Sequence, residues 1–392
     1  MILFKIDILN FCYNSCMYNE SLNSIKSENL YRIIKDRQSS QDRIIKIDGV
    51  DLLNFSSNDY LGLASNIEIF DTAVLLSREY GSAGASRLLS GGCPLHKRLE
   101  RDIAKYKGTE QALIYNSGYA ANIGAIPALV SNGDEIFSDQ LNHASIIDGC
   151  RLSKAVTHIY NHNDLDHLES LLQKSSAKIK LIITESVFSM DGDIAPISEI
   201  FNLCKDFYNA LLYIDDAHAT GVISNPNIKS DNIIYMGTFS KALGSYGGYI
   251  ASTHTIIDFL INRSRSLIYS TALPAFNIAM SIASLEYMIK NPQLNQKLID
   301  NINYLRIGLL NAGIDVSLEQ TPIIPILLDS SDGALNLSKY LIERGIYVPA
   351  IRPPTVKHPR LRISVSAFHT KDDLALLIDC LLLYYSSLKV SE

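Results

Sequence analysis

One lysine stands in a setting suited to covalent chemistry. Lys241 lies within GTFSKALGSYGG (residues 237–248), where glycine and small hydroxyl residues follow an apolar stretch typical of a strand. In a partly desolvated loop the charged form of an amine is disfavoured, so its pKa falls and it can form a Schiff base with a carbonyl. A solvated lysine beside a flexible turn is the alternative interpretation. The segment is not a phosphate-binding P-loop, because no Gly-Lys-Ser/Thr follows a four-residue spacer.

Two carboxylates and a histidine end another apolar stretch, LLYIDDAHATG (residues 211–221). Acids seldom lie at the buried end of a strand without a partner. Asp215 could therefore be held ionised by a cation, and a protonated pyridine nitrogen is one candidate, with His218 above the same strand end. Two alternatives stay open: Asp216 could cap a helix, or Asp215 and His218 could bind a metal, although no third ligand is evident.

Two further segments also follow apolar stretches. In YNSGYAANIG (residues 115–124) a strand leads into a helix whose first backbone amides could bind phosphate, although an ordinary serine cap with a glycine turn fits equally well. In DQLNHASIIDG (residues 139–149), His143 could stack on a flat ring. A histidine satisfied within a loop or core is the alternative there.

Together these features describe one site with an amine nucleophile, a carboxylate, a stacking imidazole and a phosphate-binding helix start. Pyridoxal 5'-phosphate needs each of them, because its aldehyde reacts with a lysine, its ring nitrogen must stay protonated, and its phosphate needs backbone donors. The sequence therefore predicts pyridoxal 5'-phosphate as the cofactor, and no metal.

The elements that would position this site alternate between helix and strand patterns up to about residue 251. LHKRLERDIAKY repeats Leu95, Leu99 and Ile103 on one helical face. Short apolar stretches of strand length separate the helical patterns: QALIY, EIFSD, AVTHIY, KLIITES, LLYID, IIYMG and GGYIAS. This alternation predicts an α/β fold, with a three-layer α/β/α domain around a mostly parallel sheet and ligands at the carboxyl ends of its strands.

After about residue 275 the pattern changes to longer helices and a few strands, which predicts a smaller C-terminal α+β domain. We therefore expect an N-terminal segment (residues 1–57), a large cofactor-binding domain (residues 58–285) and a small domain (residues 286–392).

We assign no chemical role to residues 1–24. Residues 1–24 could be an extension, since Met17 could be a second start, and the start lacks the features of a secretory signal. The following segment, SENLYRIIKDR (residues 27–37), predicts a helix capped by Ser27 that packs against one of the domains.

Composition excludes several classes of protein. Of the 392 residues, 47% are apolar and 19% charged, with a net charge of -6, which argues against disorder and against a surface that binds nucleic acid. No apolar stretch reaches the roughly 18 residues that span a bilayer, so we expect no membrane segment and a cytoplasmic protein. We interpret the six scattered cysteines as reduced thiols. Cys12 and Cys16 could be half of a zinc site, but no second ligand pair stands at a suitable distance.

The motifs, in their order, resemble those of the α-oxoamine synthases, pyridoxal-phosphate enzymes of the aspartate-aminotransferase fold (fold type I). The resemblance runs from about residue 30 to about residue 379. Besides the segments above, it includes NFSSNDYLGLA, GSAGASRLLSGGCPLHKRLE, SGYAAN, LNHAS, ESVFSMDGDIAPI, DDAHATGV, TFSKALG and IYSTALP. GSAGASR and AHATG depart from the usual family segments, but they exchange tiny residues for tiny ones, so the local shape should be kept.

The resemblance implies a role for each matching residue. The implied catalytic residues are Lys241 as the Schiff-base lysine, Asp215 as partner of the pyridine nitrogen, His218 as donor to the ring oxygen and His143 as the stacking ring. The remaining implied cofactor contacts are Gly118, Tyr119, Ser189, Thr238 and, from a partner subunit, Ser270 or Thr271. The implied substrate contacts are Arg362 for the amino-acid carboxylate, His143, Asn58, and Arg32 with Thr355 for the acyl substrate.

Family members condense an amino acid with an acyl thioester and release carbon dioxide. AIRPPTV (residues 350–356) with SSNDYLGL (residues 56–63) is most similar to members that join L-alanine to a pimeloyl thioester, carried on coenzyme A or acyl carrier protein. Relatives that use glycine with a short acyl donor are one alternative. A catalytically silent scaffold subunit of the same fold is another. Such a subunit would be expected to lack Lys241 or Asp215, whereas both are present here. The resemblance also implies a homodimer with the active site at the subunit interface.

Overall fold

The computed structural model describes residues 18–390, apart from 224–227, 229 and 317–319. Most of the predicted extension, including Met17, and the pair Cys12 and Cys16 lie outside the described residues. Residues 18–27 are helical. Among the described residues, no helix combines the length and the apolar character needed to cross a membrane.

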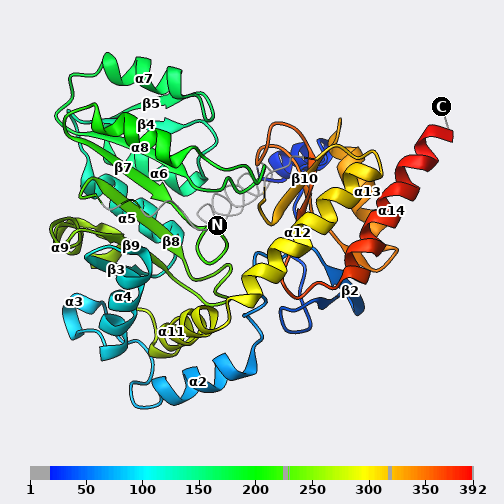
Figure 1. The fold of residues 1–392 in the computed structure, drawn as a ribbon, viewed down its shortest axis with the longest axis horizontal. Helices are drawn as coiled ribbons and strands as arrows, with labels where there is room; N and C mark the ends of the chain where they lie inside the picture. Colours follow the sequence, from blue (N-terminus) through cyan, green and yellow to red (C-terminus); the bar gives the residue numbers. More distant parts are fainter. Residues whose placement is uncertain (1–17, 224–227, 229, 317–319, 391–392) are drawn as a thin grey trace, which may run out of the picture.

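A seven-stranded sheet forms the centre of the larger part of the molecule (Figure 1). Its strands lie in the spatial order β3 (Gln111–Tyr115), β9 (Gly248–Ser252), β8 (Ile233–Thr238), β7 (Ala210–Asp215), β6 (Lys180–Glu185), β4 (Glu135–Asp139) and β5 (Val156–Tyr160). All neighbouring pairs are parallel except the two that involve β9, which is antiparallel to both β3 and β8. The carboxyl ends of β3, β4, β5, β6, β7 and β8 therefore lie at one edge of the sheet.

Helices cover both faces of this sheet, so the predicted three-layer α/β/α arrangement is confirmed. One apolar cluster joins the sheet to α4 (Pro94–Lys107), α7 (Leu165–Gln173), α8 (Ile197–Lys205) and α11 (Ala275–Lys290). The opposite cluster joins it to α5 (Gly118–Leu129), α6 (Ala144–Ser153), α9 (His254–Arg263) and α10 (Arg265–Ile268). In every strand of the sheet except the edge strand β5, neighbouring residues enter opposite clusters, as the two-residue period of a strand requires.

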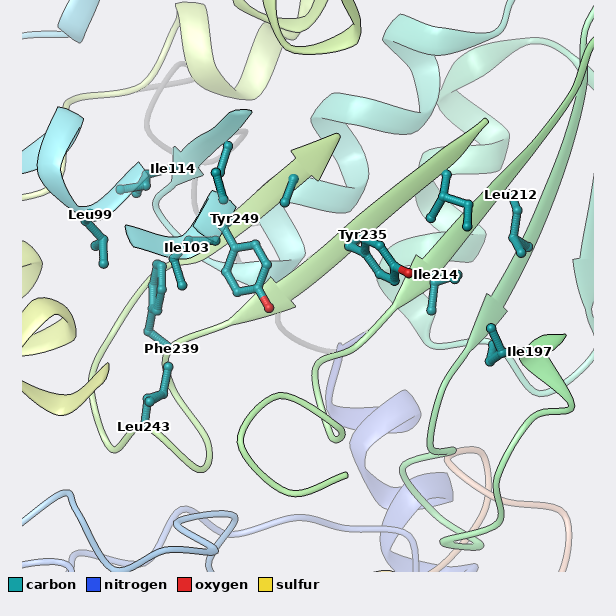
Figure 2. Close-up of a cluster of buried hydrophobic side chains, with 14 of the residues drawn as sticks. Leu99, Ile103, Ile114, Ile197, Leu212, Ile214, Tyr235, Phe239, Leu243 and Tyr249 are labelled. Carbon is teal, nitrogen blue, oxygen red and sulfur yellow. The ribbon is translucent and has the colours of Figure 1, made fainter. Parts of the chain in front are cut away.

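The helix predicted from LHKRLERDIAKY shows how local sequence places these layers. Pro94 lies in the first turn of α4, and Gly108 ends the helix in the left-handed conformation, which costs glycine little. Leu99 and Ile103 turn toward the sheet, where they pack with residues such as Tyr249 (Figure 2). Burial of an aliphatic side chain of this kind stabilises a fold by about 1.5–3 kcal/mol.

The C-terminal elements form a second region beside the sheet (Figure 1). Its antiparallel sheet has the order β10 (Ile323–Leu327), β13 (Arg360–Ser364) and β12 (Ala350–Ile351). A second small sheet joins β1 (Ile44–Ile47), β2 (Val50–Asn54) and β11 (Ile346–Tyr347). These sheets pack with α12 (Gln293–Asn311), α13 (Ser331–Ile342) and α14 (Lys371–Val390).

Two helices lie between β2 and α4 along the chain. Helix α2 (Ile67–Ser77) packs on α11, where the rings of Phe70 and Phe276 meet edge to face, and α3 (Arg87–Ser90) precedes α4.

Helix α11 runs across the boundary proposed between the large and the small domain, at residues 285 and 286. The division into three segments remains a proposal.

The helix predicted over residues 27–37 is wrong. The helix that precedes this segment reaches residue 27, so Ser27 stands at its end rather than its beginning. The Ser27 hydroxyl donates to the carbonyl of Ser24 one turn back, and so caps no following turn. Residues 30–36 form neither helix nor strand, and Arg37 forms a β-bridge with Ile47.

Candidate active site

A cavity of about 180 Å³ opens at the edge where the parallel strands of the sheet end. Most of the residues predicted to bind the cofactor line it: Gly118, Tyr119, His143, Asp215, His218, Thr238 and Lys241. They come from segments that are distant in sequence, and the sheet brings them together because each lies at or shortly after the carboxyl end of a strand. This is the edge at which open α/β sheets bind ligands.

Asp215 lies at the end of β7 and is buried. Its Oδ2 accepts a hydrogen bond of 2.9 Å from Asn122 Nδ2, and its Oδ1 accepts one of 2.9 Å from the backbone amide of Ala217. The Tyr213 hydroxyl in turn donates to Asn122 Oδ1 at 2.7 Å, which fixes the orientation of the amide. Burial raises the pKa of Asp215, whereas Lys241 and the Asn122 hydrogen bond lower it. A cation that lay against this carboxylate would favour its ionised form.

Lys241 lines the same cavity, in the loop after β8. Desolvation by burial lowers its pKa to about 8, although the nearby carboxyl groups of Asp215 and Glu185 act in the opposite direction. A substantial fraction of the amine is therefore neutral near pH 8, and a neutral amine is the nucleophilic form.

His218 and Arg362 are linked through the hydroxyl of Tyr60. That hydroxyl lies 2.7 Å from His218 Nδ1 and 3.4 Å from Arg362 Nη2. Burial lowers the pKa of His218 well below its ordinary value, so the imidazole is neutral. Arg362 also donates to Asn58 Oδ1 at 3.1 Å and to the carbonyl of Ser189 at 2.6 Å. The guanidinium is thus buried and held in one orientation beside the cavity-lining His218.

His143 caps helix α6 and lines the cavity. Its Nδ1 lies 2.7 Å from the hydroxyl of Ser145 and accepts from the Ser145 amide at 3.2 Å. Its own backbone amide donates to Glu185 Oε1 at 2.6 Å. The exposed ring is therefore fixed by hydrogen bonds at Nδ1 while its face stays available for stacking.

The beginning of α5 forms the remaining wall of the cavity. Gly118 is the first helical residue, and the side chain of Ser117 caps the helix by accepting from the amide of Ala120 at 3.0 Å. A β-carbon on Gly248 of the neighbouring strand would lie 2.6 Å from the Gly118 nitrogen, so only glycine fits there. Free amides and the positive end of the helix dipole favour an anion at this position.

The sequence interpretation missed several residues of the site. Glu185 ends β6, is buried and lines the cavity, and burial together with Asp215 raises its pKa well above the ordinary value. The stretch KLIITE has the same pattern as LLYID, an apolar strand that ends in a carboxylate, so the rule that identified Asp215 would also have found it. The roles of Asn122 and Tyr60 depend on contacts across the fold, for which the local sequence carries no signal.

Seven predicted site residues are not among those that line this cavity: Arg32, Asn58, Ser189, Ser270, Thr271, Thr355 and Arg362. Ser270 and Thr271 line a separate small cavity with Arg87. Arg32 and Thr355, both predicted to contact the acyl substrate, are joined by a hydrogen bond of 3.2 Å.

Ser189, another predicted cofactor contact, does not line the cavity in the described chain. Its backbone carbonyl instead accepts from Arg362.

Residues 50–381 match the family model described as aminotransferase class I and II, and the chain belongs to this family. A putative 8-amino-7-oxononanoate synthase from Thermodesulfovibrio yellowstonii is 45% identical over 380 residues, which cover 94% of this chain and 98% of that protein. The family predicted from the motifs is thus confirmed.

Solved structures agree with this assignment. An 8-amino-7-oxononanoate synthase from Francisella tularensis is 28% identical, with a TM-score of 0.72 over 86% of this chain and 99% of that one. A high-resolution structure of SPT (serine palmitoyltransferase) with pyridoxal 5'-phosphate is 25% identical, with a TM-score of 0.85 over 91% of this chain and 93% of that one. The α/β fold predicted from the sequence is confirmed.

Proposed function

We propose that the protein is an 8-amino-7-oxononanoate synthase, which condenses L-alanine with a pimeloyl thioester and releases carbon dioxide and the thiol, a step of biotin biosynthesis. The observation that carries this proposal is the shared cavity of Lys241 and Asp215, with the start of α5 beside them. The names of the relative from T. yellowstonii and of the structure from F. tularensis support the choice of substrates.

The cavity residues fit pyridoxal 5'-phosphate. Gly118, Tyr119 and Thr238 would hold its phosphate at the start of α5, and His143 would lie on its ring. Asp215 would face the ring nitrogen, and a positive charge there would favour the ionised form of this carboxyl group, whose pKa burial raises. When bound, the cofactor withdraws electrons from the α-carbon of the amino acid.

The side chains of this protein supply binding and proton transfer. The Arg362 guanidinium binds the alanine carboxylate through charge-assisted hydrogen bonds. The Lys241 amine, with a pKa of about 8, accepts the proton from the α-carbon and later returns one. Asp215, oriented by Asn122, stays anionic opposite the positive charge that the reaction requires. The neutral His218 imidazole, hydrogen bonded to Tyr60, donates to a ring oxygen without adding charge.

The test of the proposed function is the variant Lys241→Ala. Purified wild-type protein should have an absorbance band at about 420 nm, which is expected when a lysine is bonded to this cofactor. The variant should lose that band. The variant should also lose about 10²-fold or more in kcat with L-alanine and a pimeloyl thioester. Lys178→Ala, at an exposed position, is the matched control and should keep both properties. A band that persists in Lys241→Ala would contradict the assignment.

The substrates are separated by a product assay. L-alanine and glycine would each be offered with pimeloyl, acetyl and succinyl thioesters, on coenzyme A and on acyl carrier protein. Turnover of glycine alone with a short acyl donor would indicate a 2-amino-3-ketobutyrate CoA ligase or a 5-aminolevulinate synthase. A wild-type protein without the absorbance band and without turnover would instead fit the catalytically silent scaffold.

We further propose that the enzyme is a homodimer that acts in the cytoplasm. Ser270 and Thr271 lie outside the cavity of their own chain, which supports a role for one of them at the cofactor phosphate of a partner subunit. The short helix α3 exposes two leucines close to this position, as expected of a surface that a second subunit covers.

A further inference from the structure

An imidazole lies between two carboxylates in a part of the fold that the proposed reaction does not use. His162, in the turn after β5, has its Nδ1 2.9 Å from Asp139 Oδ1 and its Nε2 2.5 Å from Asp193 Oδ2. Because each ring nitrogen faces an acceptor, both carry a proton and the ring is a cation. All three side chains are mostly buried, which strengthens the two ion pairs.

One side of this bridge is anchored to the central sheet. Asp139 is the last residue of β4, and its side chain is fully buried. Its Oδ1 also accepts from the amide of Leu141 at 2.8 Å, and its Oδ2 accepts from the amide of Asn163 at 3.0 Å. These bonds fix the carboxylate, so His162 has a rigid support.

The other side of the bridge holds the connection between β6 and α8, residues 186–195, which we call the 186–195 loop. The loop closes on itself through a bond of 3.0 Å from the Phe188 amide to the Asp193 carbonyl and a β-bridge between Val187 and Ile194. The Phe188 ring also packs edge-on against the His162 imidazole, with the ring centroids 4.4 Å apart. His162 thus contacts the loop by one ion pair and one ring contact.

The tip of the 186–195 loop contacts two arginines of β13. The Ser189 carbonyl accepts from Arg362 Nε at 2.6 Å. The Met190 carbonyl accepts from Arg360 at 3.2 Å, and the Asp191 carboxylate pairs with the same guanidinium. A shift of the loop would therefore move an acceptor that orients the Arg362 guanidinium.

We propose that His162 is a positioning residue that, through the 186–195 loop, fixes the Arg362 guanidinium for binding of the amino-acid carboxylate. The inference rests on the proposed function, because that function supplies the amino acid. His162 is not among the described residues that line the cavity, and acts only by holding Asp193 and Phe188.

The charge of the bridge persists under assay conditions. Burial lowers the pKa of His162, but the hydrogen bonds to Asp139 and Asp193 outweigh it and raise the value to about 10. The imidazole therefore stays protonated at neutral pH and holds both carboxylates.

The test is the variant His162→Gln, in which a neutral amide replaces the cation. The dissociation constant of L-alanine, measured by titration of the cofactor-loaded enzyme, should rise about tenfold, with a smaller change in kcat and an unchanged cofactor band. His162→Arg, which restores a cation between Asp139 and Asp193, should recover most of the affinity. His158→Gln is the matched control, since His158 pairs with Glu135 on the same outer strands and does not contact the loop.

Two further results separate the possible outcomes. If wild-type enzyme does not bind L-alanine, the proposed function fails, whatever His162 does. If wild-type enzyme binds it and His162→Gln binds it equally well, or loses the cofactor band in parallel, the inference about His162 is overturned. Should His162→Gln not fold, Asp193→Asn keeps the side-chain volume and weakens the contacts of Asp193 with His162 and Asn163 on the loop side of the bridge. Unchanged affinity in this variant would equally overturn the inference.

Discussion

Two carboxyl groups, Glu185 and Asp215, end neighbouring parallel strands and act on the same amine. Their registers align directly, residue opposite residue, so both side chains reach the cavity from one edge of the sheet. Each raises the pKa of Lys241, and burial of the amine lowers it by more. The reactivity of Lys241 is therefore set by a balance between desolvation and two nearby acids.

This balance predicts a pH dependence. Because a lysine reacts as the neutral amine, uptake of pyridoxal 5'-phosphate by the apoenzyme should become faster as the pH rises, with half of the maximal rate near pH 8. In Glu185→Gln the stabilisation of the ammonium form is lost, so the midpoint should move to lower pH. Stopped-flow absorbance across the pH range measures both midpoints. A midpoint that is the same in the two proteins would mean that Glu185 carries no charge beside Lys241.

At the scale of elements, one buried ion pair ties α4 to the strand that carries Asp215. Lys107, in the last turn of α4, lies with its Nζ 2.6 Å from Asp216 Oδ2, and the Asp216 side chain is fully buried. The Ser186 hydroxyl also donates to Asp216, so the same carboxylate holds the beginning of the 186–195 loop.

Removal of this lysine should destabilise the fold. Lys107→Met leaves the buried Asp216 without its cation, and breaking a buried pair in this way costs about 3–5 kcal/mol. Thermal unfolding followed by circular dichroism should show a clearly lower midpoint. Lys105→Met changes an exposed lysine of the same helix and should unfold like the wild type. Equal midpoints for the two variants would contradict the importance of the ion pair.

The elements of the large sheet could be predicted because their signals are local. Each strand is a short apolar stretch between helical patterns, and the structure places a strand in all seven of them. The small sheet of β1, β2 and β11 could not be found in this way. Strand β11 has two residues and pairs with β2, far away in the chain, so its existence depends on tertiary packing. The prediction for the segment after Ser27 was wrong because the preceding helix reaches residue 27, which places this serine at the end of a helix instead of the beginning.

The residues of the candidate site also differ in whether local sequence can predict them. Asp215 ends β7 and Lys241 lies in the loop after β8, so chain position alone indicates that they converge. The supporting contacts of Asn122, Tyr60 and His162 join residues that are far apart in sequence. Local sequence contains no information on such pairs, and only the folded chain reveals them.

At the scale of the whole molecule, the proposed dimer predicts an effect of a single surface charge. Leu89 in α3 is 84% exposed, although it is a large apolar residue. Leu89→Asp should therefore shift the protein toward monomer in analytical ultracentrifugation and reduce activity, because a charge on a buried dimer surface is costly. Tyr208→Asp, at a residue 87% exposed between α8 and β7, is the matched control. A dimer that withstands Leu89→Asp would exclude α3 from the interface.

The residues around the cavity and the arginine beside it are synthesised at different stages of translation. The side chains around the cavity extend from Ser117 to Lys241, whereas the guanidinium beside it comes from β13, near the end of the chain. A nascent polypeptide therefore has all the groups that would hold the cofactor well before it has Arg362. Under the proposed function, the residue that would bind the amino-acid carboxylate is therefore synthesised after those that would hold the cofactor.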